Sequence, residues 1–197
     1  MRKNILLIFA FCISVSYAFS QNWTEKQIEE ANTAKDISYI SQMEKDVIMY
    51  INLARLYPQD FARIELKDYY GPAKYGNYLE NSPYKASLEE TLNTMKPVVA
   101  LQFDQELYES AKCFAKESGE AGITGHTRVK CPKANVAECC SYGMDTAKDV
   151  VLQLLIDHNV ASLGHRKICL DPSYTKAGAS EHPHTKYTTC TVVDIIW

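Results

Sequence analysis

The cysteines constrain this chain most, because their chemistry depends on whether the chain is exported. Seven cysteines are present, and six remain once the first twenty residues are set aside. An even number of cysteines in an exported chain favours disulfides. The disulfide candidates are Cys113, Cys131, Cys139, Cys140, Cys169 and Cys190.

Residues 1–20 have the pattern of a cleavable secretory signal peptide. Arg2 and Lys3 form a basic start, and an apolar stretch covers residues 5–15. Small residues at Ala18 and Ser20 suit a signal peptidase, so we expect Gln21 to become the new N-terminus. The apolar stretch is far below the roughly 20 residues that a membrane-spanning helix needs. We therefore expect a secreted, extracellular or periplasmic protein without a membrane span.

The remaining chain is long enough for one domain and is mildly acidic. Removing the signal leaves 177 residues, which can bury a sizeable core. Without Arg2 and Lys3 the formal charge changes from −3 to −5, and no basic cluster indicates nucleic-acid binding. We expect a polar, partly helical leader over residues 21–42 and a single domain over residues 43–197.

Apolar residues recur with helical spacing through most of this domain. Val47, Tyr50, Ile51 and Ala54 mark one face of a helix that Pro58 ends or kinks. A short helix is expected over residues 60–66. Three further helix starts are predicted from capping residues, at Ser87, Asp104 and Thr146.

The C-terminal part has the composition of β-strands. Residues 174–180 and 187–196 are the two expected strands, and the second is rich in Thr, Val and Ile. The polar residues 181–186 are expected to join them as a long hairpin loop. Helices followed by a terminal hairpin predict an α+β fold, with a sheet packed on helices.

The candidate site residues are two histidines and two acids, His126, Glu138, Asp157 and His165. Imidazole and carboxylate both suit zinc, so these residues can form a divalent-metal site or a hydrogen-bonded polar cleft. Alternatively, they lie apart on the surface, because such spacings are common by chance. Asp157 extends an apolar helix face at the helix C-terminus, where an acid requires exposure or a partner. His158 would point about 100° away on a continuing helix, so we expect it outside the site.

Other chemistry is less favoured. The cysteines lack the C-x2-C spacing of a metal site, and a disulfide-bonded cysteine is no nucleophile. Ser162 and His165 lack a Gly-x-Ser-x-Gly turn. His182 and His184 alternate within the expected hairpin loop, where we expect solvated side chains rather than a metal site.

The order of several motifs resembles the CAP superfamily, named for cysteine-rich secretory proteins, antigen 5 and pathogenesis-related proteins. "LQFDQELYESAKCFAKESGEAGITGHT" is similar to the family's helix and loop histidine, and "AECCSYG" to its Gly-Glu-Asn segment. "VLQLLIDHNVASLGHRKICLDPSYTKAGAS" resembles its next helix, Gly-His motif and strand, and "YTTCTVVDIIW" its closing strand. "VIMYINLARLYPQDFARIEL" resembles the first helix of bacterial-type members. The resemblance covers about residues 43–197.

This resemblance implies a three-layer α-β-α sandwich with a central antiparallel sheet. It also implies a cleft lined by His126, Glu138 and His165, with Asp157 as the match for the fourth member. The chain departs from the family pattern in three ways, the first being a segment between Glu138 and His165 that is shorter than in animal members, as in bacterial-type ones. Gly-Glu-Asn has become Ala-Glu-Cys at residues 137–139, and Arg166 follows His165 in place of an aromatic residue.

For function, the resemblance implies an extracellular protein without one agreed biochemical activity, and our first hypothesis is a secreted binding module. We expect its cleft to hold Zn²⁺ or another divalent metal through His126 and His165, or a small ligand. The expected partner is an extracellular protein, a lipid or a small ligand, with the tyrosine-rich residues 67–85 as contact surface. The alternatives are a metal-dependent hydrolase with Glu138 as general base, and a lipid or sterol carrier.

Six cysteines allow 15 connectivities. Cys131 is close enough in sequence to Cys139 or Cys140 to close a small loop. Cys169 and Cys190 flank the expected hairpin and form a second candidate pair, which leaves Cys113 with the remaining partner.

Overall fold

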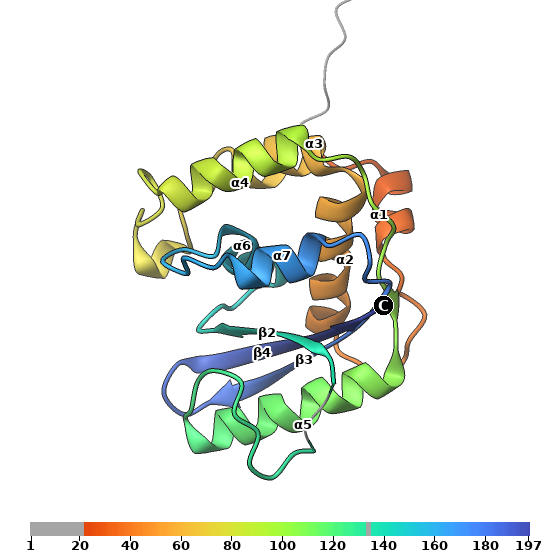
Figure 1. The fold of residues 1–197 in the computed structure, drawn as a ribbon, viewed down its shortest axis with the longest axis vertical. Coiled ribbons are helices and arrows are strands. Elements are labelled where there is room, and N and C mark those ends of the chain that lie inside the picture. The colour runs from red at the N-terminus through yellow and green to blue at the C-terminus, as the bar shows by residue number, and fades with distance from the viewer. Residues whose placement is uncertain (1–21, 133–134) are drawn as a thin grey trace, which may run out of the picture.

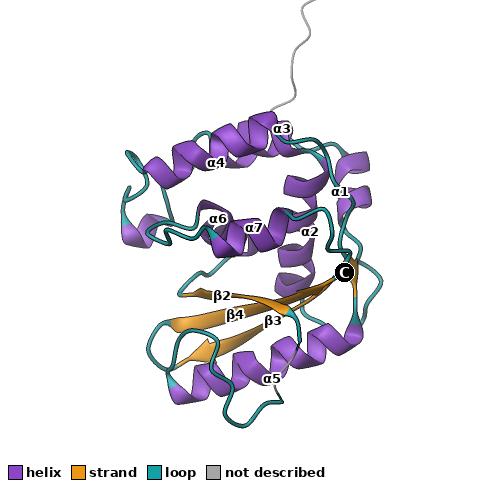
Figure 2. Ribbon diagram, in the orientation of Figure 1, coloured by secondary structure: helices purple, strands orange, loops and turns teal. Residues whose placement is uncertain are grey.

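A computed structural model describes residues 22–132 and 135–197, so the expected signal peptide lies outside the described residues. Helices and one four-stranded sheet make up a mixed α/β fold (Figures 1 and 2). The elements are α1 (Glu25–Ala31), α2 (Gln42–Leu56), α3 (Pro58–Phe61), the π-helix η1 (Ala62–Leu66), the 3-10 helix η2 (Ala73–Tyr75), α4 (Pro83–Thr94), β1 (Gln102–Phe103), α5 (Gln105–Ala121), β2 (Ala137–Tyr142), α6 (Ala147–Ile156), α7 (Gly164–Leu170), β3 (Lys176–His184) and β4 (Thr188–Ile196).

The sheet is mixed, which corrects the expectation of a wholly antiparallel one. Its strand order is β1-β3-β4-β2, with β1 parallel to β3 and the other two pairs antiparallel. The parallel strand is only two residues long, so the β3–β4 hairpin and β2 form most of the sheet. In the β2–β4 pair, Glu138 lies opposite Asp194, which places two acids side by side near the candidate site.

Helices cover both faces of the sheet (Figure 1). On one face, α5 packs along β3 and β4. On the other, α2 contacts β3, while α6 and α7 contact β2, and α4 lies beyond α6. Gly178 on β3 lets α5 approach closely, because a Cβ there would lie 2.0 Å from the backbone nitrogen of Tyr108. The apolar core is accordingly divided into a large cluster on the α2/α6 side and a small one beneath α5.

Two of the three predicted helix starts are confirmed. The side chains of Asp104 and Thr146 accept backbone N–H groups in the first turns of α5 and α6. The start predicted at Ser87 is wrong, since α4 begins at Pro83. Ser82 caps that helix, and proline suits the first helical position because its missing N–H would have no partner there.

The hairpin loop is shorter than predicted, because β3 continues to His184. His184 is buried, and its Nε2–H donates to the carbonyl of Ile123 at 2.9 Å. Its Nδ1 accepts the backbone N–H groups of Lys186 and Tyr187. The expectation of a solvated His184 is therefore wrong: this histidine closes the hairpin turn.

Two buried polar side chains on α2 hold irregular segments in place. Asn52 bonds both the N–H and the C=O of Leu101. The fully buried guanidinium of Arg55 donates to four backbone carbonyls, those of Val99, Cys169, Asp171 and Tyr174. Because two of these carbonyls lie at the end of α7, Arg55 fixes the position of the helix that carries His165.

Candidate functional site

Asp157 and His165 form the first half of the candidate site. Asp157 ends α6 in the left-handed conformation, with φ of 55°, which its short polar side chain tolerates. Its Oδ1 accepts the Nδ1–H of His165 at 2.7 Å, and its Oδ2 accepts the backbone N–H of His165 at 3.0 Å. The acid at the end of an apolar face thus has its partner at the start of α7.

His126 and Glu138 form the second half. Nδ1 of His126, in the loop after α5, lies 2.9 Å from Oε1 of Glu138 on β2. The other carboxylate oxygen of Glu138 accepts two N–H groups of Arg128, which also contacts the fully buried Asp194. His126 therefore sits at the end of a chain of buried charges that β2, β4 and the loop hold together.

These contacts shift the pKa values of the second pair in opposite directions. The hydrogen bond to Glu138 raises the pKa of His126 above its ordinary value. Burial raises the pKa of Glu138, but the hydrogen bonds from His126 and Arg128 outweigh burial and lower it overall. Glu138 is therefore ionised at neutral pH, so it can only accept, and the Nδ1 of His126 carries the proton.

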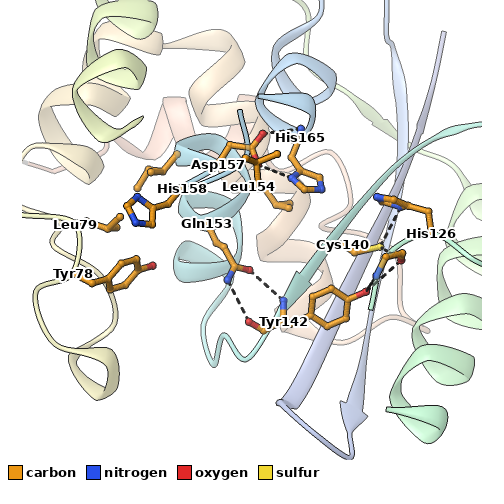
Figure 3. Close-up of a pocket in the computed structure, with 13 residues that line it drawn as sticks. Tyr78, Leu79, His126, Cys140, Tyr142, Gln153, Leu154, Asp157, His158 and His165 are labelled. Carbon is orange, nitrogen blue, oxygen red and sulfur yellow. Dashed lines mark hydrogen bonds and ion pairs between the residues drawn. The ribbon is translucent and has the colours of Figure 1, made fainter. Parts of the chain in front are cut away.

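The two pairs meet at one cavity of about 350 Å³ (Figure 3). His126, Asp157 and His165 line it, and the ring centroids of the two histidines lie 6.2 Å apart. Glu138 supports His126 without lining the cavity. The four candidate residues are thus brought together, three at the wall and one directly behind it.

Sequence reasoning missed several wall residues. His158 was expected outside the site, but it lines the cavity, because α6 ends at Ile156 and the helical direction does not continue. Its Nδ1 lies 2.9 Å from Oγ of Ser82, and its ring packs edge-on against Tyr78 and Tyr84. Tyr78 belongs to the tyrosine-rich segment, which therefore contributes to the cavity as well as to the surface.

Cys140 and Tyr142 complete the wall on the β2 side. The Sγ of Cys140 lies 3.7 Å from Nδ1 of His126 and 3.6 Å from the carbonyl of Gly125. Tyr142 hydrogen-bonds the backbone N–H of Gly125 at 3.1 Å. The only signal for either residue was strand alternation, which places residues 140 and 142 on one face once β2 is known.

His126, Glu138 and Cys140 are a group that could hold a metal ion, with ligand atoms within 4.8 Å of one another. This set differs from the predicted pair of His126 and His165, because it uses the Nδ1 side of His126. His126 and His165 both line the cavity, and their ring centroids lie 6.2 Å apart. Both nitrogens of His126 therefore need to be considered as ligands.

The predicted disulfide pairing is wrong. Cys113 on α5 is bonded to Cys131, with a Cα–Cα distance of 5.9 Å, rather than Cys131 to Cys139 or Cys140. Cys139, Cys140, Cys169 and Cys190 are buried and are not bridged in this structure. Cys169 and Cys190 cannot bridge, because they lie in the apolar clusters on opposite faces of the sheet.

The comparisons with known proteins add no relative: no protein-family model and no curated protein matches this chain. Among the described residues, no helix combines the length and apolar character needed to cross a membrane.

Proposed function

We propose that this chain is an extracellular binding module of the CAP superfamily, whose cleft holds a divalent cation through Nε2 of His126 and of His165. One observation carries the proposal: each of two histidines at one cavity uses Nδ1–H to bond a buried carboxylate. Metal-binding histidines commonly donate their second N–H to a carboxylate, which fixes the ring and leaves the other nitrogen as a neutral ligand.

The side of His126 that faces Glu138 and Cys140 is a poorer cation site. Both oxygens of Glu138 already accept hydrogen bonds, from His126 and from the buried guanidinium of Arg128. A cation on Glu138 would lie beside that fixed positive charge and break both contacts. Burial also raises the pKa of Cys140 well above its ordinary value, so its thiol is protonated and is no ready ligand.

The rest of the cavity suits a small ligand better than a bare ion. Its wall adds Tyr78, Tyr142 and the apolar side chains Leu79 and Leu154 to the polar pair of histidines. A second hollow adjoins it, shares Tyr78, Tyr142 and Gln153 with it, and is completed by Tyr75, Met144 and Tyr187. Apolar walls with few convergent polar groups are typical of small-molecule sites. A cation held by the histidines would supply a positive anchor for an anionic or carbonyl group of that ligand.

Binding is favoured over hydrolysis by the position of Glu138. A general base must reach the water or substrate whose proton it takes. Glu138 faces His126 and Arg128, does not line the cavity, and has a lowered pKa that makes it a weak base. The lipid-carrier alternative would need a long apolar pocket, whereas the lining of this cavity of about 350 Å³ includes Asp157 and three histidines.

The proposal is tested by the effect of zinc on thermal unfolding of the full chain. A cation that binds only the folded state raises the melting temperature as its concentration rises. We expect this rise for the wild type and for His182→Ala, which removes a histidine outside the cleft. We expect it to disappear in His126→Ala and His165→Ala. Equal stabilisation of all four proteins would show that zinc binds elsewhere and would overturn the proposal.

A further inference from the structure

Adjacent cysteines on β2 point to opposite faces of the sheet. Cys139 belongs to the apolar cluster on the side of α2, α6 and α7, whereas Cys140 belongs to the cluster beneath α5. This follows from the alternation of side chains along a strand. The two neighbours therefore cannot share one partner, and each must be considered with the cysteines on its own face.

On its own face Cys139 meets Cys169. The Sγ of Cys139 lies 3.9 Å from the carbonyl of His165, at the start of α7. Cys169 lies four residues further along α7, one turn on and on the same side of the helix. Both side chains are completely buried, and both belong to the same apolar cluster, where β2 and α7 are in contact. No other described cysteine lies in their apolar cluster.

We propose that Cys139 and Cys169 form a second disulfide, which joins β2 to α7 when the chain folds in the presence of a disulfide-bearing oxidant. One cysteine, as its thiolate, attacks the disulfide of the oxidant, which gives a mixed disulfide and releases one thiol. The second cysteine attacks the mixed disulfide and releases the second thiol. The two protein thiols lose two electrons and two protons, and the oxidant gains both as two thiols.

The oxidation must precede the closure of the core. In the folded chain neither sulfur is accessible, and the contact with Cys169 together with burial raises the pKa of Cys139 well above its ordinary value. A buried, protonated thiol is a poor nucleophile for exchange. The bond therefore forms during folding and, once formed, resists reductants that cannot reach it.

This disulfide would tie together the two halves of the cleft. Cys139 directly follows Glu138, which supports His126, and Cys169 lies one turn after His165 on α7. A covalent link at this point fixes the β2 half of the site relative to the α7 half. This link does not depend on a bound metal, because both cysteines are buried in one apolar cluster where β2 contacts α7.

Cys140 and Cys190 do not form an equivalent pair. They share the α5 face, but the register sets Cys140 opposite Val192 and Cys190 opposite Tyr142. Their sulfur atoms contact different backbone carbonyls, of Gly125 at 3.6 Å and of Ala115 at 3.2 Å. We expect both to remain thiols, so they serve as internal controls.

The test is disulfide mapping of the full chain, secreted by an expression host or refolded with oxidised and reduced glutathione. The protein is unfolded in denaturant with an alkylating reagent and no reductant, digested, and analysed by mass spectrometry with fragmentation. We expect two crosslinked peptide pairs, Cys113 with Cys131 and Cys139 with Cys169, and alkylated Cys140 and Cys190. Alkylation of both Cys139 and Cys169, or a crosslink of either to another cysteine, would overturn the proposal.

Cys140→Ser provides a matched variant, because Cys139 and Cys140 share one tryptic peptide. The crosslink to Cys169 must persist in Cys140→Ser and be absent from Cys139→Ser. Because the mapping of the wild-type protein needs no substitution, the test holds even where a variant fails to fold. A crosslink lost in Cys140→Ser but kept in Cys139→Ser would contradict the assignment.

Discussion

Asp157 binds both the ring and the backbone of His165. Its Oδ1 lies 2.7 Å from the ring Nδ1, and its Oδ2 lies 3.0 Å from the backbone nitrogen of the same residue. One buried carboxylate therefore caps α7, orients its histidine, and ends α6 at the same time. The position of His165 at the cavity depends on this single side chain.

Asp157→Asn tests that dependence with little change in shape. Asn also tolerates the left-handed backbone at this position, but its NH₂ must face one of the N–H groups that the carboxylate accepts. We expect a loss of about 1–3 kcal/mol of stability and about 10- to 100-fold weaker zinc binding. Denaturant unfolding and calorimetric titration measure the two effects. Asp145→Asn, at an exposed ion pair with Lys74, is the control and should change neither quantity appreciably.

The interaction of His126 with Glu138 predicts a pH window. Because the pKa of His126 is raised in the fold, its contribution is full below about 6.5 and is lost as the pH rises through the folded value. Because the pKa of Glu138 is lowered, its contribution is present above about 4.5 and is lost as the pH falls through the folded value. The pair therefore stabilises the folded state most between about pH 4.5 and pH 6.5. In Glu138→Gln, an NMR titration should show the pKa of His126 moving down towards its ordinary value; an unchanged pKa would refute the pairing.

The raised pKa of Asp194 predicts a dependence of stability on pH that is opposite to that of Glu138. Burial raises its pKa from 3.8 to about 6, despite hydrogen bonds from Ser110 and Arg128, and its Oδ1 has no hydrogen-bond partner within the described residues. A raised acid pKa means that the folded state holds its proton longer, so stability decreases as the pH rises from about 4 to 6. This loss amounts to about 2–3 kcal/mol. Asp194→Asn should flatten the dependence of unfolding free energy on pH over that range, whereas an unaltered slope would contradict the assignment.

Arg55→Lys tests how α7 is anchored. The Arg55 guanidinium donates to four backbone carbonyls, and a lysine ammonium, with its single nitrogen, cannot donate to all four. We expect a loss of about 3 kcal/mol or more in the free energy of unfolding by denaturant, because buried carbonyls lose their donors. The matched change Arg63→Lys, at a half-buried helix-surface pair with Asp60, should cost less than about 1 kcal/mol. An equal loss of stability in Arg55→Lys and Arg63→Lys would show that the buried hydrogen bonds of Arg55 contribute little to stability.

Much of the secondary structure could be predicted because its signals are local. The apolar repeat from Val47 and the caps at Asp104 and Thr146 depend only on neighbouring residues; the repeat lies within α2, and the caps begin α5 and α6. The helix start predicted at Ser87 was wrong because Ser82, which is followed by Pro83, caps α4 five residues earlier. The sequence alone does not decide between Ser82 and Ser87 as the cap, because tertiary contacts determine which turn becomes the first turn of the helix.

The disulfide could not be predicted because it depends on a loop folding back onto a helix. Glu117 on α5 accepts the backbone N–H groups of Val129, Lys130 and Cys131. These hydrogen bonds, of which that from Cys131 has the largest effect, lower the pKa of Glu117. They also bring Cys131 beside Cys113, which lies one turn before Glu117 on α5. Nothing in the spacing of the cysteines reports such a contact.

The sequence pointed to four residues that the fold brings together, but not to their arrangement or to the other residues of the cavity wall. Apolar periodicity indicated that Asp157 faces inward, and the motif order related His126 to His165. The roles of Arg128 behind Glu138 and of Tyr78 at the wall arise from segments far apart in the chain. His158 was misplaced because the prediction continued α6 past the residue at which the backbone turns left-handed.

The most direct test of the account is an anomalous-diffraction map from crystals of the full chain soaked in zinc. The account predicts one peak in the cleft, within coordination distance of Nε2 of both His126 and His165. Both Nδ1 atoms should remain bonded to Glu138 and Asp157. A cleft without a peak at millimolar zinc would contradict the central claim, and so would a peak held by Glu138 and Cys140 on the other side of His126.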